Sequence, residues 1–133
     1  MIFIVSSFLV RQGFNGITIW PFVIARNKHL KEDPVFINHE KIHLRQQLEM
    51  LVLPFYVWYT LEYLLRLLQY RNRHTAYRNI SFEREAYAKE NDLNYLKRRS
   101  FFGFLEYVKF LFSWVGESFV FFSTEEVFFS FKF

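Results

Sequence analysis

The sequence predicts a mainly α-helical domain with a short β-strand or hairpin in front of its first long helix. Between residues 34 and 99, apolar residues recur at intervals of three and four, which is the period of amphipathic helices. Residues 1–25 are instead β-branched and aromatic, with glycines and a proline between the apolar runs. A chain of 133 residues is expected to form one domain, residues 1–133, large enough to bury a core.

The N-terminal segment is expected to supply the strands. Residues 1–10 form an apolar run that we interpret as a buried strand or as one face of an interfacial segment. Residues 17–20 and 22–25 flank Pro21, which has no N–H to donate to a sheet. This unit therefore lies at a sheet edge or turns at Pro21. An edge strand at this point of the chain could pair with an extended peptide substrate.

The first long helix is predicted to begin at Asp33-Pro34, since Asp favours the N-cap and Pro the first helical position. Pro54 is expected to end or kink it. The helix carries the H-E-x-x-H motif at residues 39–43. A chance occurrence of this motif in a chain of this composition is expected only about 0.01 times, so chance is a poor explanation for it.

The spacing of the motif favours a metal site. Positions i and i+4 share one face of a helix, so His39 and His43 can present their imidazoles to one metal ion. Glu40 cannot be a further ligand from its position, but it can reach a metal-bound water and act as general base. Gln47 lies on the same side and is expected as an outer hydrogen-bonding group of the site.

A second helix is predicted for residues 55–70, with a polar stripe made by Glu62, Arg66 and Gln69. The uncharged run before Glu62 is too short to span a bilayer, and extending it brings in charges. A buried or interfacial helix and a tilted transmembrane helix both remain open. Residues 71–74 are interpreted as a basic linker.

A third helix is predicted from Ser81, as its cap, to about Arg99. Its first turn carries Glu83 and Glu85, which can serve as partners of the helix dipole. A zinc site with only two protein ligands is incomplete, however, and a Glu on a later helix is a standard third ligand. The prediction for that role is Glu83, with Glu85 as the alternative.

The preference for Glu83 comes from helix geometry. If Ala86 and Tyr87 face the interior, Glu83 shares their face, whereas Glu85 points more towards solvent. His29 and His74 stay open as alternative ligands, although loop histidines are more often structural. For stabilisation of an oxyanion, the spacing selects neither of two tyrosines, Tyr77 and Tyr87.

Composition bounds the metal and the partners. The chain has no cysteine, so a metal must take nitrogen and oxygen ligands. Aromatic residues make up 23% of the chain and 19 residues are Phe, which is more than a small soluble domain usually buries. A net charge of +4 beside apolar runs favours an anionic membrane surface as partner. The expected location is membrane-associated, with a cytoplasmic location as the alternative.

The C-terminal part is apolar and rich in Phe. Residues 101–114 can form an amphipathic helix behind the basic cluster at residues 97–99, which would suit a headgroup layer. Residues 115–133 are expected to be a poorly ordered apolar tail. Nucleic acid is not an expected partner, because no recognised nucleic-acid motif accompanies the basic residues.

The two motifs together resemble those of a metallopeptidase family. Residues 39–43 followed by Glu83-Arg84-Glu85-Ala86 are similar to the H-E-x-x-H plus E-x-x-A arrangement of the glutamate-zincins. They look most like the membrane-associated types related to CAAX prenyl proteases and β-lactam-sensor proteins. The resemblance implies a helical zincin-like domain with Zn²⁺ as cofactor, Glu83 as third ligand and Glu40 as base. In those families an Asp commonly follows the Ala, where this chain has Tyr87.

The segment also resembles a group of small bacterial proteins that carry the strings I-N-H-E-x-I-H and S-F-E-R-E-A-Y. Two hypotheses follow. In the first, the chain is a zinc-dependent metallopeptidase that cleaves a peptide or protein with a metal-activated water. In the second, it is a non-catalytic membrane-surface or scaffold protein in which a structural or degenerate metal site braces two helices.

Overall fold

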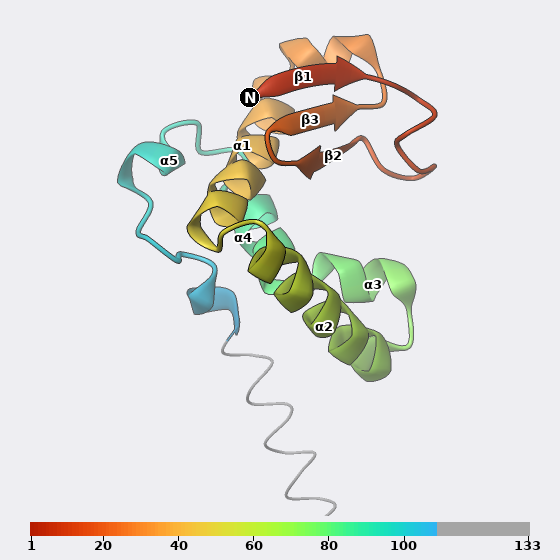
Figure 1. Cartoon of the computed structure of the whole chain (residues 1–133), viewed down its shortest axis with the longest axis vertical. Coiled ribbons are helices and arrows are strands. Elements are labelled where there is room, and N and C mark those ends of the chain that lie inside the picture. The colour runs from red at the N-terminus through yellow and green to blue at the C-terminus, as the bar shows by residue number, and fades with distance from the viewer. Residues whose placement is uncertain (109–133) are drawn as a thin grey trace, which may run out of the picture.

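A computed structural model describes residues 1–108 of the chain as a small sheet followed by helices (Figure 1). The prediction of a mainly helical fold with strands before the motif helix is confirmed. In chain order the elements are β1 (Ile2–Val5), β2 (Gly16–Ile19), β3 (Phe22–Ala25), the 3-10 helix η1 (Lys28–Glu32), α1 (Pro34–Glu49), α2 (Leu53–Tyr70), α3 (Arg73–Arg78), α4 (Ser81–Lys89) and α5 (Tyr95–Arg98).

The sheet has the order β1-β3-β2, so β3 is its central strand. β1 pairs with β3 in parallel, and β2 pairs with β3 as an antiparallel hairpin with Ile19 opposite Phe22. The predicted turn at Pro21 is therefore confirmed, and β2 is an edge strand beside α1. The prediction of a buried first strand is wrong. β1 forms the other edge, and none of its residues is fully buried.

α1 begins as predicted. The Asp33 carboxylate accepts hydrogen bonds from the N–H groups of Val35 and Phe36, at 2.9 and 3.2 Å, and Pro34 is the first helical residue. The helix ends at Glu49, earlier than the predicted break at Pro54. Pro54 lies in the first turn of α2, where its missing N–H costs nothing.

No single helix among the described residues is long and apolar enough to cross a membrane. α1 and α2 pass such a test only as a pair, on length and composition, and they meet at a bend of 112°. Residues 50–52 form the break between the two helices. Leu51 and Val52 interrupt the helical conformation there, because their φ angles are 57° and 52°.

Two apolar clusters form the core. One packs β3 and η1 against α1 through Val23, Ala25, Leu30 and Phe36. The other packs α2 and α4 against the last described residues and is formed by Phe55, Ile80, Phe82, Phe104 and Val108. The site described below lies between these clusters, where α1, α2 and α4 converge on β2 (Figure 1).

The helix predicted from Ser81 to Arg99 is two helices, α4 and α5. The side-chain amide of Asn38 on α1 donates to the carbonyl oxygens of Lys89, Glu90 and Asp92, at 2.8–3.2 Å. These bonds satisfy carbonyl groups where α4 ends, so the chain can leave the helix there. They also tie the end of α4 to the residue that precedes His39.

The N-terminus of α4 differs from the prediction as well. Its N-cap is Ile80, and Ser81 is the first helical residue. The N–H and hydroxyl of Ser81 donate to Glu62 on α2, at 2.9 and 2.6 Å. A buried carboxylate from another helix thus caps α4 in place of a local side chain.

The predicted basic linker at residues 71–74 is wrong from Arg73 on, because α3 begins there with Asn72 as its N-cap. The Asn72 side chain accepts from the N–H of Thr75 at 3.0 Å. Of the helix predicted for residues 101–114, residues 101–104 form a turn instead, residues 105–108 form a helical turn, and residues 109–114 lie outside the described residues. The predicted tail at residues 115–133 also lies outside them.

Candidate metal centre

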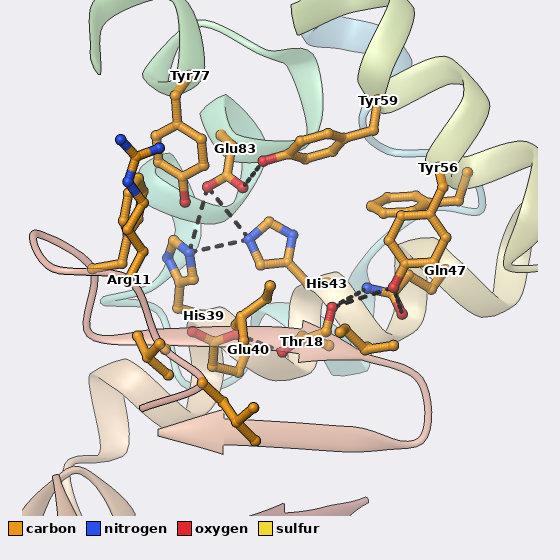
Figure 2. A pocket seen from close by; sticks show the side chains of 17 residues that line it. Arg11, Thr18, His39, Glu40, His43, Gln47, Tyr56, Tyr59, Tyr77 and Glu83 are labelled. Carbon is orange, nitrogen blue, oxygen red and sulfur yellow. Dashed lines mark hydrogen bonds and ion pairs between the residues drawn. The ribbon is translucent and has the colours of Figure 1, made fainter. Parts of the chain in front are cut away.

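Three side chains from two helices meet at one point. His39 and His43 lie one turn apart on α1, and Glu83 reaches them from the first turn of α4 (Figure 2). The two Nε2 atoms are 3.1 Å apart, and the Glu83 Oε2 atom is 3.8 Å from that of His39 and 3.5 Å from that of His43. All three side chains are buried. The structure therefore brings together the three residues predicted as ligands.

The far nitrogen of His43 is held by Gln46. The Gln46 amide nitrogen donates to the Phe82 carbonyl and to Glu85, at 3.1 and 3.0 Å, which fixes the orientation of the amide. Its oxygen then faces His43 Nδ1 at 2.9 Å and can only accept. His43 must therefore carry a proton on Nδ1, so that Nε2 faces the cluster and presents a lone pair whenever the ring is neutral.

His39 is oriented in the same way by a carboxylate. Its Nδ1 lies 2.8 Å from Glu90 Oε2, and an ionised carboxylate can only accept. The proton of the neutral ring is therefore on Nδ1, and Nε2 again presents a lone pair. Fixing the ring by an outer hydrogen bond is the usual arrangement for a metal-binding histidine.

The third acceptor is the Glu83 carboxylate. The Tyr59 hydroxyl on α2 donates to its Oε1 at 2.8 Å, while the buried Oε2 has no hydrogen-bond partner among the described residues. Burial would raise the pKa of Glu83, but the two imidazoles and the Tyr59 hydroxyl outweigh burial and lower it. Glu83 is therefore ionised, with one oxygen directed at the two histidine nitrogens.

The protons available to the cluster are too few to give each of its two nitrogens and its carboxylate oxygen a hydrogen-bond partner. Burial and the neighbouring His43 lower the pKa of His39 to about 3. For His43, burial disfavours the charged form, but the Glu83 carboxylate and Gln46 outweigh it and raise its pKa to about 9. The cluster thus holds one proton at neutral pH, which cannot bond to three acceptors at once.

A metal ion fits the same space. The three separations define a point about 2.0 Å from both nitrogens and the oxygen, which is the bond length that Zn²⁺ makes with His and carboxylate ligands. One cation there would replace the shared proton and engage all three lone pairs. The donor set of two imidazoles and one carboxylate could also hold other divalent transition metals.

Glu40 lies next to the cluster and faces β2. Its Oε2 accepts a hydrogen bond of 2.5 Å from the Thr18 hydroxyl, which fixes the carboxyl between α1 and the edge strand (Figure 2). Burial raises the pKa of Glu40. Gly16 permits this close approach, because a Cβ there would lie 2.6 Å from the Phe36 ring and 3.1 Å from Glu40 Oε1.

A cavity of about 360 Å³ opens on the cluster. Its lining includes His39, Glu40, His43 and Glu83, together with residues of β2 and of the β1–β2 loop. Much of the lining is aromatic: Phe14 comes from the β1–β2 loop, Phe55, Tyr56 and Tyr59 come from α2, and Tyr77 comes from α3. Arg11 is the only Lys or Arg that lines this cavity among residues 1–108, and its side chain has no ion-pair partner there.

The Gln47 amide is not hydrogen-bonded to the histidines in the described part of the chain, in contrast to its predicted role. Its amide bonds to the edge strand instead: the nitrogen donates to the Thr18 carbonyl at 2.9 Å, and the oxygen accepts from the Trp20 N–H at 2.7 Å. The residue that the prediction missed is Gln46. It stands three residues after His43 and is therefore an equally close neighbour on the helix.

Glu85 is not part of the cluster, but the reason differs from the one predicted. It is fully buried, and it pairs with Arg99 and accepts from the Tyr95 hydroxyl at 2.8 Å. Arg99 also pairs with Glu49 at the end of α1, at 2.7 Å. This network joins α1, α4 and the chain after α5, and through Gln46 it supports His43.

The two histidines that were predicted to lie in loops are on helices, and the two tyrosines lie in different surroundings. His29 on η1 and His74 on α3 are exposed and take no part in the cluster. Tyr77 lines the cavity, and burial together with Glu83 raises the pKa of its hydroxyl, so it remains a proton donor. Tyr87 instead packs its ring against His39, with centroids 4.7 Å apart.

Comparison with known proteins adds no relative: no family model, curated protein or solved structure matches the chain. The resemblance to the glutamate-zincins therefore rests on the two motifs and on a buried His₂Glu cluster that could hold a metal ion.

Proposed function

We propose that this chain is a zinc-dependent peptidase, with His39, His43 and Glu83 as metal ligands and Glu40 as the proton carrier. The observation that carries the proposal is the convergence of two imidazole nitrogens and a buried carboxylate oxygen that share a single proton, beside a cavity that Glu40 also lines. Three protein ligands that leave a position open are typical of catalytic zinc sites, whereas structural sites use four.

A bound zinc ion would polarise a carbonyl group and lower the pKa of its water to about 7. Glu40 would accept the proton of the attacking water and pass it to the leaving amine. Burial raises the pKa of Glu40, which is the direction that favours proton uptake by a carboxylate. The Thr18 hydroxyl holds Glu40 in place, and Tyr77 is the preferred donor to the developing oxyanion.

The edge strand supports a peptide as substrate. The Thr18 carbonyl and the Trp20 N–H bond to Gln47, so the main-chain groups of these two residues point away from β3. The direction of these groups repeats every second residue along a strand, so the N–H and carbonyl of Gly16 point to the same outer edge of β2. An extended peptide could pair with β2 there, beside Glu40. The apolar cavity wall would then receive a hydrophobic side chain of the peptide.

Metal analysis of protein purified without a histidine tag tests the proposal. About one zinc per chain is expected, and Glu40→Gln should keep that zinc while abolishing cleavage of a pool of internally quenched peptides. Glu32→Gln is the matched control, because Glu32 is exposed and precedes α1. If the wild type binds zinc but cleaves no peptide, and Glu40→Gln binds zinc equally well, the non-catalytic hypothesis is favoured. A wild type that binds no zinc would reject every metal-dependent role.

A further inference from the structure

The second long helix has its charged residues inside and its leucines outside. Of the three fully buried side chains of α2, two are charged: Glu62 and Arg66, with 2% and 0% exposure. They pair with each other at 3.3 Å, and Glu62 also accepts from Ser81. The polar stripe predicted for this helix therefore faces the protein, which is the reverse of an ordinary surface helix.

The outer face carries no charge. Its exposed positions between residues 53 and 68 are Leu53, Pro54, Val57, Thr60, Leu61, Leu64, Leu65 and Leu68. Exposure is 76% for Leu53, 57% for Leu61 and 70% for Leu68, so these leucines are largely uncovered by residues 1–108. With Leu51 at the preceding turn they form a stripe about 25 Å long, on the order of 700 Å², which exceeds the usual apolar patch of a soluble monomer.

The borders of this stripe fit a lipid surface. Trp58, Tyr63 and Tyr70 are half-buried along its sides, as amphipathic aromatic rings are at the membrane interface. At its C-terminal end, Arg71, Arg73 and His74 are exposed, and no Asp or Glu accompanies them. Cations at the end of an uncharged apolar stripe are complementary to anionic headgroups around acyl chains.

We propose that the outer face of α2, from Leu51 to Leu68, docks on an anionic lipid surface with the helix lying along the membrane plane. A stripe along one side of a helix suits this orientation, because the opposite side is packed on α3 and α4. The inner face of α2 supplies Phe55, Tyr56 and Tyr59 to the cavity, so docking places the metal centre about one helix diameter from the lipid.

Single-site fluorescence provides the test, because the full chain has no native cysteine. Leu64→Cys places an environment-sensitive dye on the stripe, and Leu93→Cys places it in the α4–α5 loop at similar exposure, 49% against 54%. With vesicles of phosphatidylcholine and phosphatidylglycerol, the dye at position 64 should shift to the blue and be quenched by brominated acyl chains. The dye at position 93 should not change.

Flotation with the same vesicles gives a second readout. The full-length double variant Leu61→Gln/Leu68→Gln should partition into vesicles at least about tenfold less than the wild type, while Leu93→Gln behaves as the wild type. Circular dichroism checks that each variant is folded. Neither readout requires a bound metal or hydrolysis, so the result is independent of the proposed peptidase function.

Three outcomes would overturn the proposal. Equal quenching at positions 64 and 93, or unchanged partition of the double variant, would place the lipid contact elsewhere. A dye at position 64 that is already shielded without vesicles would mean that protein covers the face. Sedimentation distinguishes a second copy from another segment of the same chain in that case, because only a second copy makes the shielding depend on concentration.

Discussion

Two buried polar clusters lie close together in the described part of the chain, and they differ in how their donors and acceptors match. Around Glu62, four donors serve the two carboxylate oxygens: Arg66 and the Ser81 N–H on one, the Ser81 hydroxyl and the Trp58 ring nitrogen on the other. Around Glu83, three acceptors face each other and share one proton.

The difference separates a structural role from a metal-binding one. Glu62 is complete without any added group, and it caps α4 from the outside. Glu83 is ionised and buried, and its Oε2 faces the two histidine nitrogens at 3.5 and 3.8 Å with no donor at hydrogen-bond distance among the described residues. A cation would complete the site. Burial and charge are similar in the two clusters, so the shortage of donors is the feature that marks the metal centre.

The largest expected effect comes from removing the Glu83 carboxylate from the cluster that it forms with His39 and His43. Glu83→Gln should lower zinc affinity more than about a hundredfold, since loss of a ligand costs more than loss of an outer hydrogen bond. The metal-free variant should be less stable than the metal-free wild type at neutral pH, because the two imidazoles and the Tyr59 hydroxyl stabilise the ionised carboxylate and lower its pKa. Competition with a chelating dye measures the affinity, and urea unfolding in excess chelator measures the stability. A variant that still binds zinc as the wild type does would remove Glu83 from the site.

A substitution in the cluster around Glu62 should have the opposite effect and change stability but not zinc affinity. Arg66→Met leaves the Glu62 carboxylate buried without its ion-pair partner, and we expect a loss of about 3–5 kcal/mol in the free energy of unfolding. Zinc affinity of the folded variant should not change. Arg73→Met is the control, because Arg73 is exposed. If Arg66→Met costs no more than this control, the contrast between the two clusters is wrong.

The outer hydrogen bonds of the metal centre should give an intermediate effect. Glu90→Ala removes the acceptor that orients His39, and zinc affinity is expected to fall about 10–100-fold. Glu106→Ala changes an exposed carboxylate and should leave the affinity unaltered. Equal affinities of the two variants would mean that His39 is oriented by packing, for example by the Tyr87 ring.

The smallest effect concerns Glu40. Thr18→Val keeps the shape of the side chain but removes the hydroxyl that holds the Glu40 carboxyl. If hydrolysis is detected, kcat/KM should fall about tenfold, the effect of a lost positioning contact of roughly 1.4 kcal/mol, while the zinc content stays the same. A parallel loss of zinc would instead assign Thr18 a role in forming the metal centre.

Sequence reasoning was most successful where the relevant interactions are local. The start of α1 follows from Asp33-Pro34, and the pairing of His39 with His43 follows from helical period. Glu83 was favoured by its face on a later helix, and the structure does place it at the histidines. Its rival Glu85 was misjudged, because a partner 14 residues away, Arg99, allows a carboxylate to be fully buried.

The interactions that the sequence did not reveal are those between distant segments. Nothing near Glu90 or Tyr59 marks them as partners of His39 and Glu83, since the contacts join residues 51 and 24 positions apart. The inverted polarity of α2 was missed for the same reason. A stripe of Glu62, Arg66 and Gln69 looks like a solvated face until Ser81 is known to cover it.

X-ray absorption at the zinc edge of protein loaded with one equivalent of zinc tests the central claim most directly. We predict a site with only nitrogen and oxygen ligands at about 2.0 Å, including two imidazole rings, and loss of this spectrum in Glu83→Gln. A zinc ion bound by fewer than two imidazoles, or an unchanged spectrum in Glu83→Gln, would contradict the account.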